Sequence, residues 1–320
     1  MAILNLLDLQ PTTISRDLRD KYILLYGPAK CGKTSFAAQI PNNLIFCFEK
    51  GVNFLPGVFA VDVPKWVEFK ALLKQLEKDE IKQKFKTVTI DTVSLAYDLC
   101  TQYICSQNNV KTLGDIAYGK GYALVKDEFT NSLRQISMLG YGIVLITHAK
   151  VKNVKIDDDT TVEIASPNIP DRAQDVVNAL VDIIGYIDVS YENGTATRTL
   201  VTRGTPNIVA GSRLKYLAPR IPFGYDELIN AIGEAIEKQA KIDGAKVVDK
   251  GTMQKVIEKR PFEETLAEAK ELWTKLVSEG KAEVVMAEVE SLFGEPMKLS
   301  EIPESKQDIF EVLIEDMRSM

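Results

Sequence analysis

Short apolar runs recur along the first 240 residues and alternate with segments of helical periodicity. Runs without polar alternation are typical of strands buried on both faces of a parallel sheet. The predicted strands cover residues 22–26, 44–48, 87–90, 142–147 and 181–189. The predicted helices cover residues 34–40, 67–84, 93–105, 122–139 and 226–240. The pattern therefore predicts an α/β fold with a mainly parallel central sheet.

One later region has a different pattern. Residues 188–209 alternate β-branched and polar residues around Asn193-Gly194, a dipeptide that favours a tight hairpin turn. We expect this hairpin to add antiparallel strands to the edge of the parallel sheet.

The C-terminal part of the chain predicts a separate helical domain. A polar stretch at residues 241–261 is a candidate linker between a core at residues 21–240 and three amphipathic segments at residues 262–320. Residues 1–20 form an N-terminal segment before the core. The apolar faces of the three segments are predicted to contain Leu266, Ala269, Trp273, Leu276 and Val277, then Val284, Val285, Val289 and Leu292, then Ile309, Val312, Leu313 and Met317.

Charge separates the two predicted domains. Residues 262–320 contain fifteen Asp and Glu against six Lys and Arg, a net charge of −9, which leaves the preceding residues at +3. The acidic domain would repel DNA, so it is expected to contact a basic partner, to compete with DNA for a basic groove, or only to keep the protein soluble.

Composition excludes several classes of protein. A 45% hydrophobic fraction with 26% charged residues is that of an ordinary globular protein. Four cysteines and one histidine exclude a disulfide framework and a Cys/His zinc finger, and they favour a reducing cytoplasm. No apolar run approaches the roughly 18 residues that a membrane helix needs, so no membrane association is expected.

The strongest motif is Gly27-Pro-Ala-Lys-Cys-Gly-Lys-Thr34, a full match to G-x-x-x-x-G-K-[ST] between a predicted strand and a predicted helix. In such a loop the backbone N–H groups and the helix N-terminus bind phosphate oxygens. Lys33 is expected to contact the β- and γ-phosphates and Thr34 to bind Mg²⁺. The residues assigned to this nucleotide-binding loop are Gly27, Pro28, Ala29, Lys30, Cys31, Gly32, Lys33, Thr34 and Ser35.

Three further residues at predicted strand ends are candidates for catalysis. Asp91 is expected to hold Mg²⁺ through water, although an aspartate there also caps helices. Glu49 is a candidate general base for the attacking water, or else a solvated loop residue. His148 is placed to hydrogen-bond the γ-phosphate and sense its loss, or else is an ordinary core or surface histidine.

Residues 149–175 show no clear periodicity and are expected to form a long loop, which in a compact domain is usually functional or mobile. Its cations are candidate contacts to a nucleic-acid backbone. The candidate DNA-binding residues are Lys150, Lys152, Lys155 and Arg172. The alternative is a solvated charge run, since Asp157, Asp158 and Asp159 cancel the charge locally. The segment also lacks an aromatic residue for base stacking.

Several segments together resemble a known family. They are YGPAKCGKTS at 26–35, FCFEKG at 46–51, TVTIDTVSLAYDL at 87–99, YGKGYALVKDEF at 118–129, YGIVLITHAK at 141–150 and GSRLKYLAPRI at 211–221. The sequence resembles the RecA-like branch of P-loop ATPases over about residues 12–235. In particular it is similar to phage-encoded AAA-type nucleotide-binding proteins and Sak-group single-strand annealing proteins.

The resemblance implies a P-loop NTPase core that binds ATP and Mg²⁺ and assembles into a homo-oligomeric ring or filament. It places the fourth strand between the first and third, with His148 beside Lys33 where RecA has a glutamine. The loop after His148 would contact single-stranded DNA. Arg213 and Lys215 look similar to the basic pair that reaches the γ-phosphate of a neighbouring subunit; an exposed pair on an edge strand is the alternative.

Three functions are compatible with these motifs. The favoured one is a DNA-stimulated ATPase in phage recombination, annealing or replication, which would act in the host cytoplasm with a single-strand-binding or replication protein. A second is an oligomeric motor or helicase loader that acts through a protein partner. A GTPase is disfavoured because no N-K-x-D motif is present, since Val154 follows Asn153. A small-molecule kinase is disfavoured because the long loop lacks an arginine-rich lid.

Overall fold

The computed structural model describes residues 14–15, 21–155, 161–192, 195–244, 247–248 and 261–320. It divides them into two compact units, a larger one that ends before residue 257 and a smaller one at residues 261–320. Each unit has a hydrophobic core of its own. Within the described ranges, no helix is long and apolar enough to cross a membrane.

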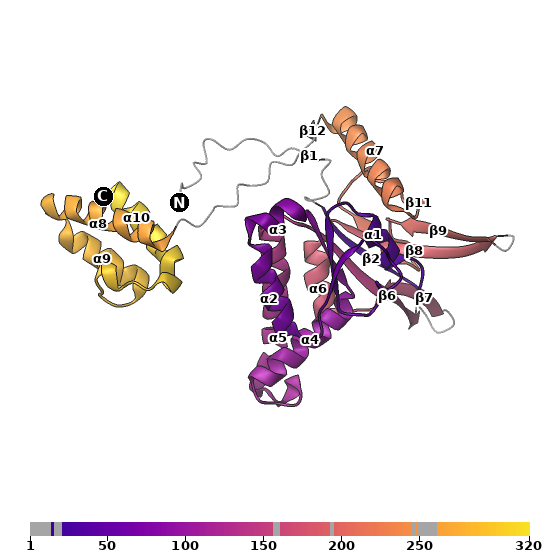
Figure 1. Cartoon of the computed structure of the whole chain (residues 1–320), viewed down its shortest axis with the longest axis horizontal. Coiled ribbons are helices and arrows are strands. Elements are labelled where there is room, and N and C mark those ends of the chain that lie inside the picture. Colours follow the sequence, from indigo (N-terminus) through magenta and orange to yellow (C-terminus); the bar gives the residue numbers. More distant parts are fainter. Residues whose placement is uncertain (1–13, 16–20, 156–160, 193–194, 245–246, 249–260) are drawn as a thin grey trace. The chain divides into compact units, whose positions relative to one another are not determined.

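Six strands of the larger unit form a parallel sheet in the order β4, β3, β5, β6, β2, β8. They are β2 (Tyr22–Gly27), β3 (Asn43–Cys47), β4 (Phe59–Asp62), β5 (Thr87–Asp91), β6 (Gly142–Lys155) and β8 (Ile183–Glu192). Figure 1 shows this sheet, with β2, β6 and β8 labelled. The predicted parallel sheet is confirmed, and β6 lies between β2 and β5 as the resemblance implied. The sequence analysis missed β4, a strand of four residues at the edge of the sheet, although Phe59, Ala60 and Val61 are apolar.

Antiparallel strands extend the sheet beyond β8, as predicted. β9 pairs with β8, β11 pairs with β9, and β10 pairs with the first residues of β8. Asn193 and Gly194, at the predicted turn, lie outside the described residues. The bounds are β9 (Thr195–Val201), β10 (Gly211–Ser212) and β11 (Arg220–Pro222).

The prediction of an unstructured loop at residues 149–175 is wrong. β6 continues to Lys155 and pairs in antiparallel register with β7 (Thr161–Pro167), and α6 (Asp171–Leu180) follows. This ribbon is largely exposed beyond the core, so neither of its faces requires the apolar residues that make a buried strand recognisable. The three aspartates at 157–159 lie outside the described residues.

Helices cover both faces of the sheet because side chains alternate along each strand. Leu24 of β2 faces the layer of α2, α4, α5 and α6, whereas Ile23 and Leu25 face α1 and α7. The predicted helix at 67–84 is divided into α2 and α3. The bounds are α1 (Lys33–Gln39), α2 (Trp66–Leu76), α3 (Asp79–Lys84), α4 (Val93–Gln107), α5 (Lys120–Met138) and α7 (Tyr225–Asp243).

The predicted linker begins with residues that belong to the larger unit. α7 continues to Asp243, and β12 (Val247–Val248) pairs in parallel with β1 (Ile14–Ser15). The rest of the linker at 249–260, and most of the predicted N-terminal segment at 1–20, lie outside the described residues.

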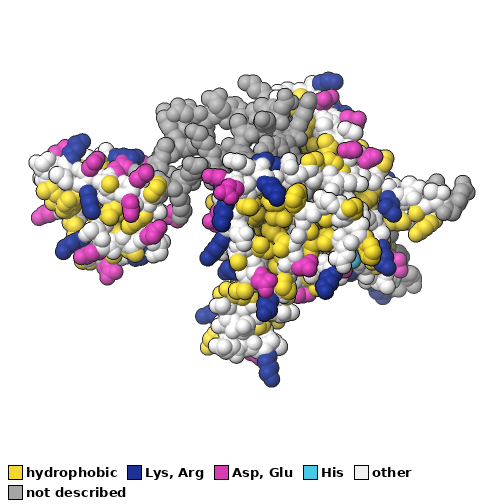
Figure 2. Space-filling model, viewed as in Figure 1, with side chains coloured by type: hydrophobic (Ala, Val, Ile, Leu, Met, Phe, Trp, Pro, Cys, Tyr) yellow, Lys and Arg dark blue, Asp and Glu magenta, His cyan; other side chains and the backbone are white. Residues whose placement is uncertain are grey.

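The smaller unit contains the three predicted helices. They are α8 (Phe262–Ser278), α9 (Ala282–Phe293) and α10 (Gln307–Ser319). A buried polar contact joins two of them, because Thr265 donates to the Glu311 carboxylate at 2.6 Å. Figure 2 shows acidic and basic side chains interspersed over the visible face of this unit rather than one acidic patch.

The predicted apolar faces of these helices are too wide. Val277, Val284, Ile309 and Val312 are exposed, whereas Ala269, Leu276, Val285, Val289, Leu313 and Met317 are buried. Three helices around a small core bury only a narrow stripe of each, so apolar residues beside that stripe remain in solvent.

Phe69 on α2 provides a test of the core. Its buried ring contacts the rings of Phe46, Phe48 and Trp66 at centroid distances of 5.5, 5.4 and 4.8 Å. Because Phe69→Ala leaves a cavity here, we expect it to lower the free energy of unfolding by about 3–5 kcal/mol. Urea unfolding followed by Trp66 fluorescence in a Trp273→Phe background measures this. Val67→Ala, on the exposed side of the same helix, is the control and should change it by less than about 0.5 kcal/mol.

Candidate nucleotide-binding site

β2, β5 and β3 end at one edge of the parallel sheet, and β6 extends beyond it there. Each of these strands bears a predicted site residue at or just after this edge. Gly27 ends β2 and lies opposite His148 in the register of β6. Asp91 ends β5 and lies opposite Cys47 of β3. The backbone N–H of Glu49 donates to the carbonyl of Asp91 at 3.1 Å. The sheet order therefore brings together residues that are far apart in the sequence.

The phosphate-binding motif forms the turn between β2 and α1. The buried Lys33 ammonium donates to the carbonyl oxygens of Gly27 and Pro28, at 3.2 and 2.7 Å, which holds the side chain inside the turn. A Cβ on Gly27 would lie 2.9 Å from the Cβ of Ile187, so only glycine fits there. Gly32 has a φ of +101°, which side chains other than glycine rarely adopt. Both glycines of the motif are thus explained by the geometry of the turn.

Thr34 and Asp91 form the contact expected of a magnesium site. The Thr34 hydroxyl donates to Oδ2 of Asp91 at 2.6 Å. Burial raises the pKa of the Asp91 carboxyl, the hydrogen bond from Thr34 opposes this, and the charge of Glu49 adds to it. A buried carboxylate beside a hydroxyl fits a hard cation that takes its other ligands from phosphate oxygens and water. No cluster of three or more His, Cys, Asp or Glu side chains competes for a metal elsewhere in the described part of the chain.

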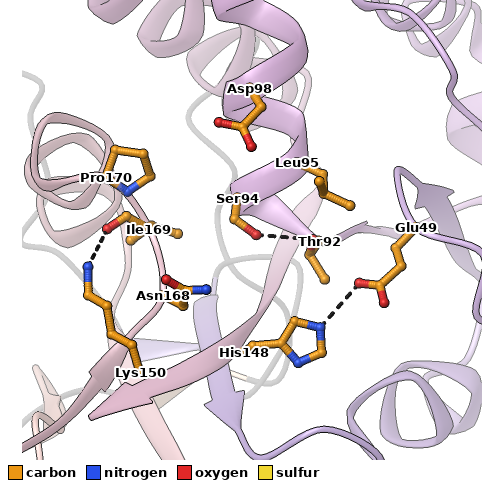
Figure 3. A pocket seen from close by; sticks show the side chains of 10 residues that line it. All are labelled: Glu49, Thr92, Ser94, Leu95, Asp98, His148, Lys150, Asn168, Ile169 and Pro170. Carbon is orange, nitrogen blue, oxygen red and sulfur yellow. Dashed lines mark hydrogen bonds and ion pairs between the residues drawn. The ribbon is translucent and has the colours of Figure 1, made fainter. Parts of the chain in front are cut away.

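Glu49 and His148 contact each other beside this pair. Nε2 of His148 lies 3.2 Å from Oε2 of Glu49, and both side chains are partly exposed. Figure 3 shows the two side chains pointing toward each other, and both line a pocket of about 630 Å³. The pocket is also lined by the first residues of α4, among them Ser94, and by Asn168 and Lys150. The two candidate catalytic side chains therefore face solvent-filled space in which a water molecule has room.

The candidate DNA-binding residues lie along the ribbon and the start of α6, and they make contacts within the chain. Lys150 donates to the carbonyl of Ile169 at 2.8 Å, and burial lowers its pKa. Lys152 pairs with Asp171 at 3.6 Å. The Arg172 guanidinium lies 4.3 Å from the centre of the Tyr122 ring. Lys155 is exposed at the end of β6. Lys150 lines the pocket, and because side chains alternate along a strand, Lys150 and Lys152 share one face of β6, whereas Lys155 lies on the other face.

Arg213 and Lys215 lie elsewhere. The Arg213 guanidinium bonds to Asp182 and to the Ala179 carbonyl, and Lys215 pairs with Asp243. They follow β10, which pairs with the first residues of β8, so they are at the amino edge of the parallel sheet. The structure does not bring them to the phosphate loop of their own chain, and their role toward a neighbouring subunit stays a prediction.

The sequence analysis missed Arg198 of β9. Its Nη1 lies 3.2 Å from the position that a Cβ on Gly32 would take. An arginine in an exposed hairpin strand has no local signal that relates it to a loop so distant in the sequence, and only the pairing of β8 with β2 brings it there.

Comparison with known proteins agrees with this geometry. Residues 19–214 match the sequence model of the AAA domain family. The chain belongs to the AAA domain family. The match includes the phosphate loop, Asp91 and His148 and ends before α7. Membership in the AAA family indicates a nucleotide-binding ATPase domain.

A relative with the same overall length is known from a prophage. The chain is 26% identical over 326 residues to the SPbeta prophage-derived uncharacterized protein YorG of Bacillus subtilis (strain 168). The alignment covers 97% of each chain, so it includes the C-terminal helices as well as the AAA domain.

The buried Asp91 carboxyl predicts a pH-dependent cost to stability. The pKa of this carboxyl is higher in the folded protein than in the unfolded chain. Between these two pKa values the folded state keeps a proton that the unfolded state has lost, so the free energy of unfolding falls as the pH rises. With EDTA and without nucleotide, we expect Asp91→Asn to raise Tm at pH 8 by roughly 2–4 °C, the shift that about 1 kcal/mol produces in a domain of this size.

The higher Tm of Asp91→Asn should disappear at acidic pH, because the wild-type Asp91 carboxyl is then neutral too. Thermal unfolding between pH 4 and 8 measures it, with the exposed Asp127→Asn as the control. An Asp91→Asn variant that is no more stable than wild type at pH 8 would show that the ionised carboxyl is not destabilising.

Proposed function

We propose that this AAA-domain protein is an Mg²⁺-dependent ATPase that acts on single-stranded DNA in phage recombination, annealing or replication, as a homo-oligomer in the host cytoplasm. One observation supports this above all. β6 bears His148, which contacts Glu49, and the same strand continues without a break into the ribbon that bears Lys150, Lys152 and Lys155. A single rigid element thus connects the catalytic residues to the candidate DNA contacts.

The chemistry follows from the positions of the side chains. Lys33 and the loop N–H groups bind the β- and γ-phosphates, and Mg²⁺ held at Thr34 and Asp91 would neutralise their charge. Glu49 orients the attacking water and accepts its proton. His148 Nε2 can hydrogen-bond either Glu49 or a γ-phosphate oxygen, so its partner changes when the γ-phosphate is bound and again when it leaves.

His148 can pass this change to the ribbon through the backbone. The carbonyl of His148 accepts a hydrogen bond from the N–H of Asn168 at 2.8 Å, across the base of the ribbon. The neighbouring Thr147 hydroxyl donates to the Asn168 carbonyl at 3.1 Å. A movement of His148 therefore acts on both strands of the ribbon.

Two exposed tyrosines, one of them beside a candidate DNA-binding cation, support single-stranded DNA as the partner. Tyr118, in the turn between α4 and α5, is 97% exposed. Tyr122, at the start of α5, is partly exposed beneath Arg172. Single-strand binding combines cations that contact phosphates with aromatic rings on which bases stack. Tyr118 and Tyr122 provide the stacking groups that residues 149–175 lack.

A motor or helicase loader that acts through a protein partner is the alternative. The smaller unit favours it, because that unit is acidic and exposes Val284 and Val312 on its surface. Such a unit suits a basic protein with an apolar patch better than a nucleic acid.

The first test is steady-state hydrolysis of ATP with and without single-stranded DNA. We expect hydrolysis to require Mg²⁺, to be stimulated several-fold by the DNA, and to be lost in Lys33→Ala, which lacks the cation at the phosphates. Hydrolysis that is indifferent to DNA would contradict the DNA role and favour the protein-partner alternative. Hydrolysis that persists in Lys33→Ala would contradict the assigned site.

His148 provides a test of the coupling. The ratio of DNA-stimulated to basal hydrolysis should fall to about one in His148→Ala, because Glu49 and the γ-phosphate lose their shared partner. His148→Gln, which retains a hydrogen-bond donor, is the matched control and should keep most of the stimulation. A His148→Ala variant with the wild-type ratio would exclude His148 as the sensor.

A further inference from the structure

Arg198 is a cation beside the phosphate loop to which the sequence motifs assign no role. Its guanidinium lies against Gly32, with Nη1 at 3.2 Å and Cζ at 3.9 Å from the position of a Cβ on that glycine. The side chain is exposed, and its guanidinium makes no hydrogen bond or ion pair with any residue that the structure describes. By contrast, Arg220 on the neighbouring strand β11 pairs with Asp188.

Contacts of Phe223 hold the backbone of Arg198 in place. The N–H of Phe223 donates to the Arg198 carbonyl at 3.0 Å. The Phe223 ring is 3.6 Å from the same position on Gly32 and stacks on Phe36 of α1 at 5.4 Å and 16°. The strand that bears Arg198 is therefore fixed against the loop and α1, and only the guanidinium end is free to contact a ligand.

The order of the strands indicates which part of a nucleotide Arg198 would contact. Asp91 ends β5, Glu49 follows β3 and His148 is on β6, and these three strands lie to one side of β2. β8 and β9 lie on the other side of β2. With the γ-phosphate at the catalytic residues, the phosphate chain crosses the loop, and the α-phosphate and nucleoside point toward β8 and β9. Arg198 is at that end.

We propose that Arg198 binds the α-phosphate of the nucleotide in its own subunit. A guanidinium offers paired N–H donors that match two phosphate oxygens, and a charge-assisted contact of this kind strengthens binding. Both ATP and ADP have an α-phosphate, so Arg198 strengthens the binding of both and does not distinguish them. The inference rests only on the nucleotide-binding part of the proposed function and is independent of DNA.

Isothermal titration calorimetry with Mg²⁺ and either ADP or a non-hydrolysable ATP analogue tests this contact. In Arg198→Ala we expect Kd for both nucleotides to rise by the same factor, about tenfold or more. Arg198→Lys keeps the charge but loses the paired N–H donors of the guanidinium. Its Kd for each nucleotide should lie between those of wild type and Arg198→Ala.

Arg220→Ala is the matched control, because it removes an exposed arginine from the adjacent strand, and it should bind both nucleotides like wild type. An Arg198→Ala variant that unfolds at the wild-type Tm and binds both nucleotides normally would overturn the proposal. Weaker binding of the ATP analogue alone would also overturn it, since that result means a γ-phosphate contact.

The outcomes separate this inference from the proposed function. If wild type binds nucleotides but is not stimulated by DNA, the DNA role fails and the Arg198 result stands. If wild type is stimulated by DNA and Arg198→Ala binds both nucleotides normally, only the Arg198 contact fails. Wild-type protein that binds neither nucleotide would overturn both.

Discussion

The parallel alignment of β2, β6, β5 and β3 is the constraint on which the rest of the structure depends. Parallel neighbours need crossover connections, so helices must cover both faces, and every carboxyl end lies at the same edge. That edge collects the phosphate loop, His148, Asp91 and Glu49 from four separate parts of the chain. The same alignment places Arg213 and Lys215 at the opposite edge, because they follow a strand that pairs with the beginning of β8.

The site combines charges that a core would not otherwise accommodate. Asp91 and Lys33 are both buried, and the raised pKa of Asp91 shows that its hydrogen bond from Thr34 does not fully offset desolvation. A carboxylate in such a position is destabilising until a cation or a phosphate-bound metal compensates for it. The geometry is thus organised for a ligand at some cost to the stability of the free protein, as is common at functional sites.

Two pairs of strands extend beyond the parallel sheet, one on each side of the phosphate loop. β6 is buried where it pairs with β2 and β5 and exposed where it pairs with β7, and His148 lies at the transition. β8 and β9 form a second extension on the other side of the phosphate loop, with Arg198 at the loop. Each extension connects a residue beside the phosphate loop to strands that are exposed to solvent.

The sequence by itself determined the parts that depend on local pattern. The phosphate loop, the buried strands and the helices around them follow from motif spacing and hydrophobic periodicity, which short stretches of chain specify. The tertiary structure decided what depends on pairing between distant segments. It determined that β6 and β7 form an exposed ribbon, that Glu49 contacts His148, and that Arg198 lies on the loop. It also determined which apolar positions of α8, α9 and α10 are buried, because a helix face alone does not specify how much of it its neighbours cover.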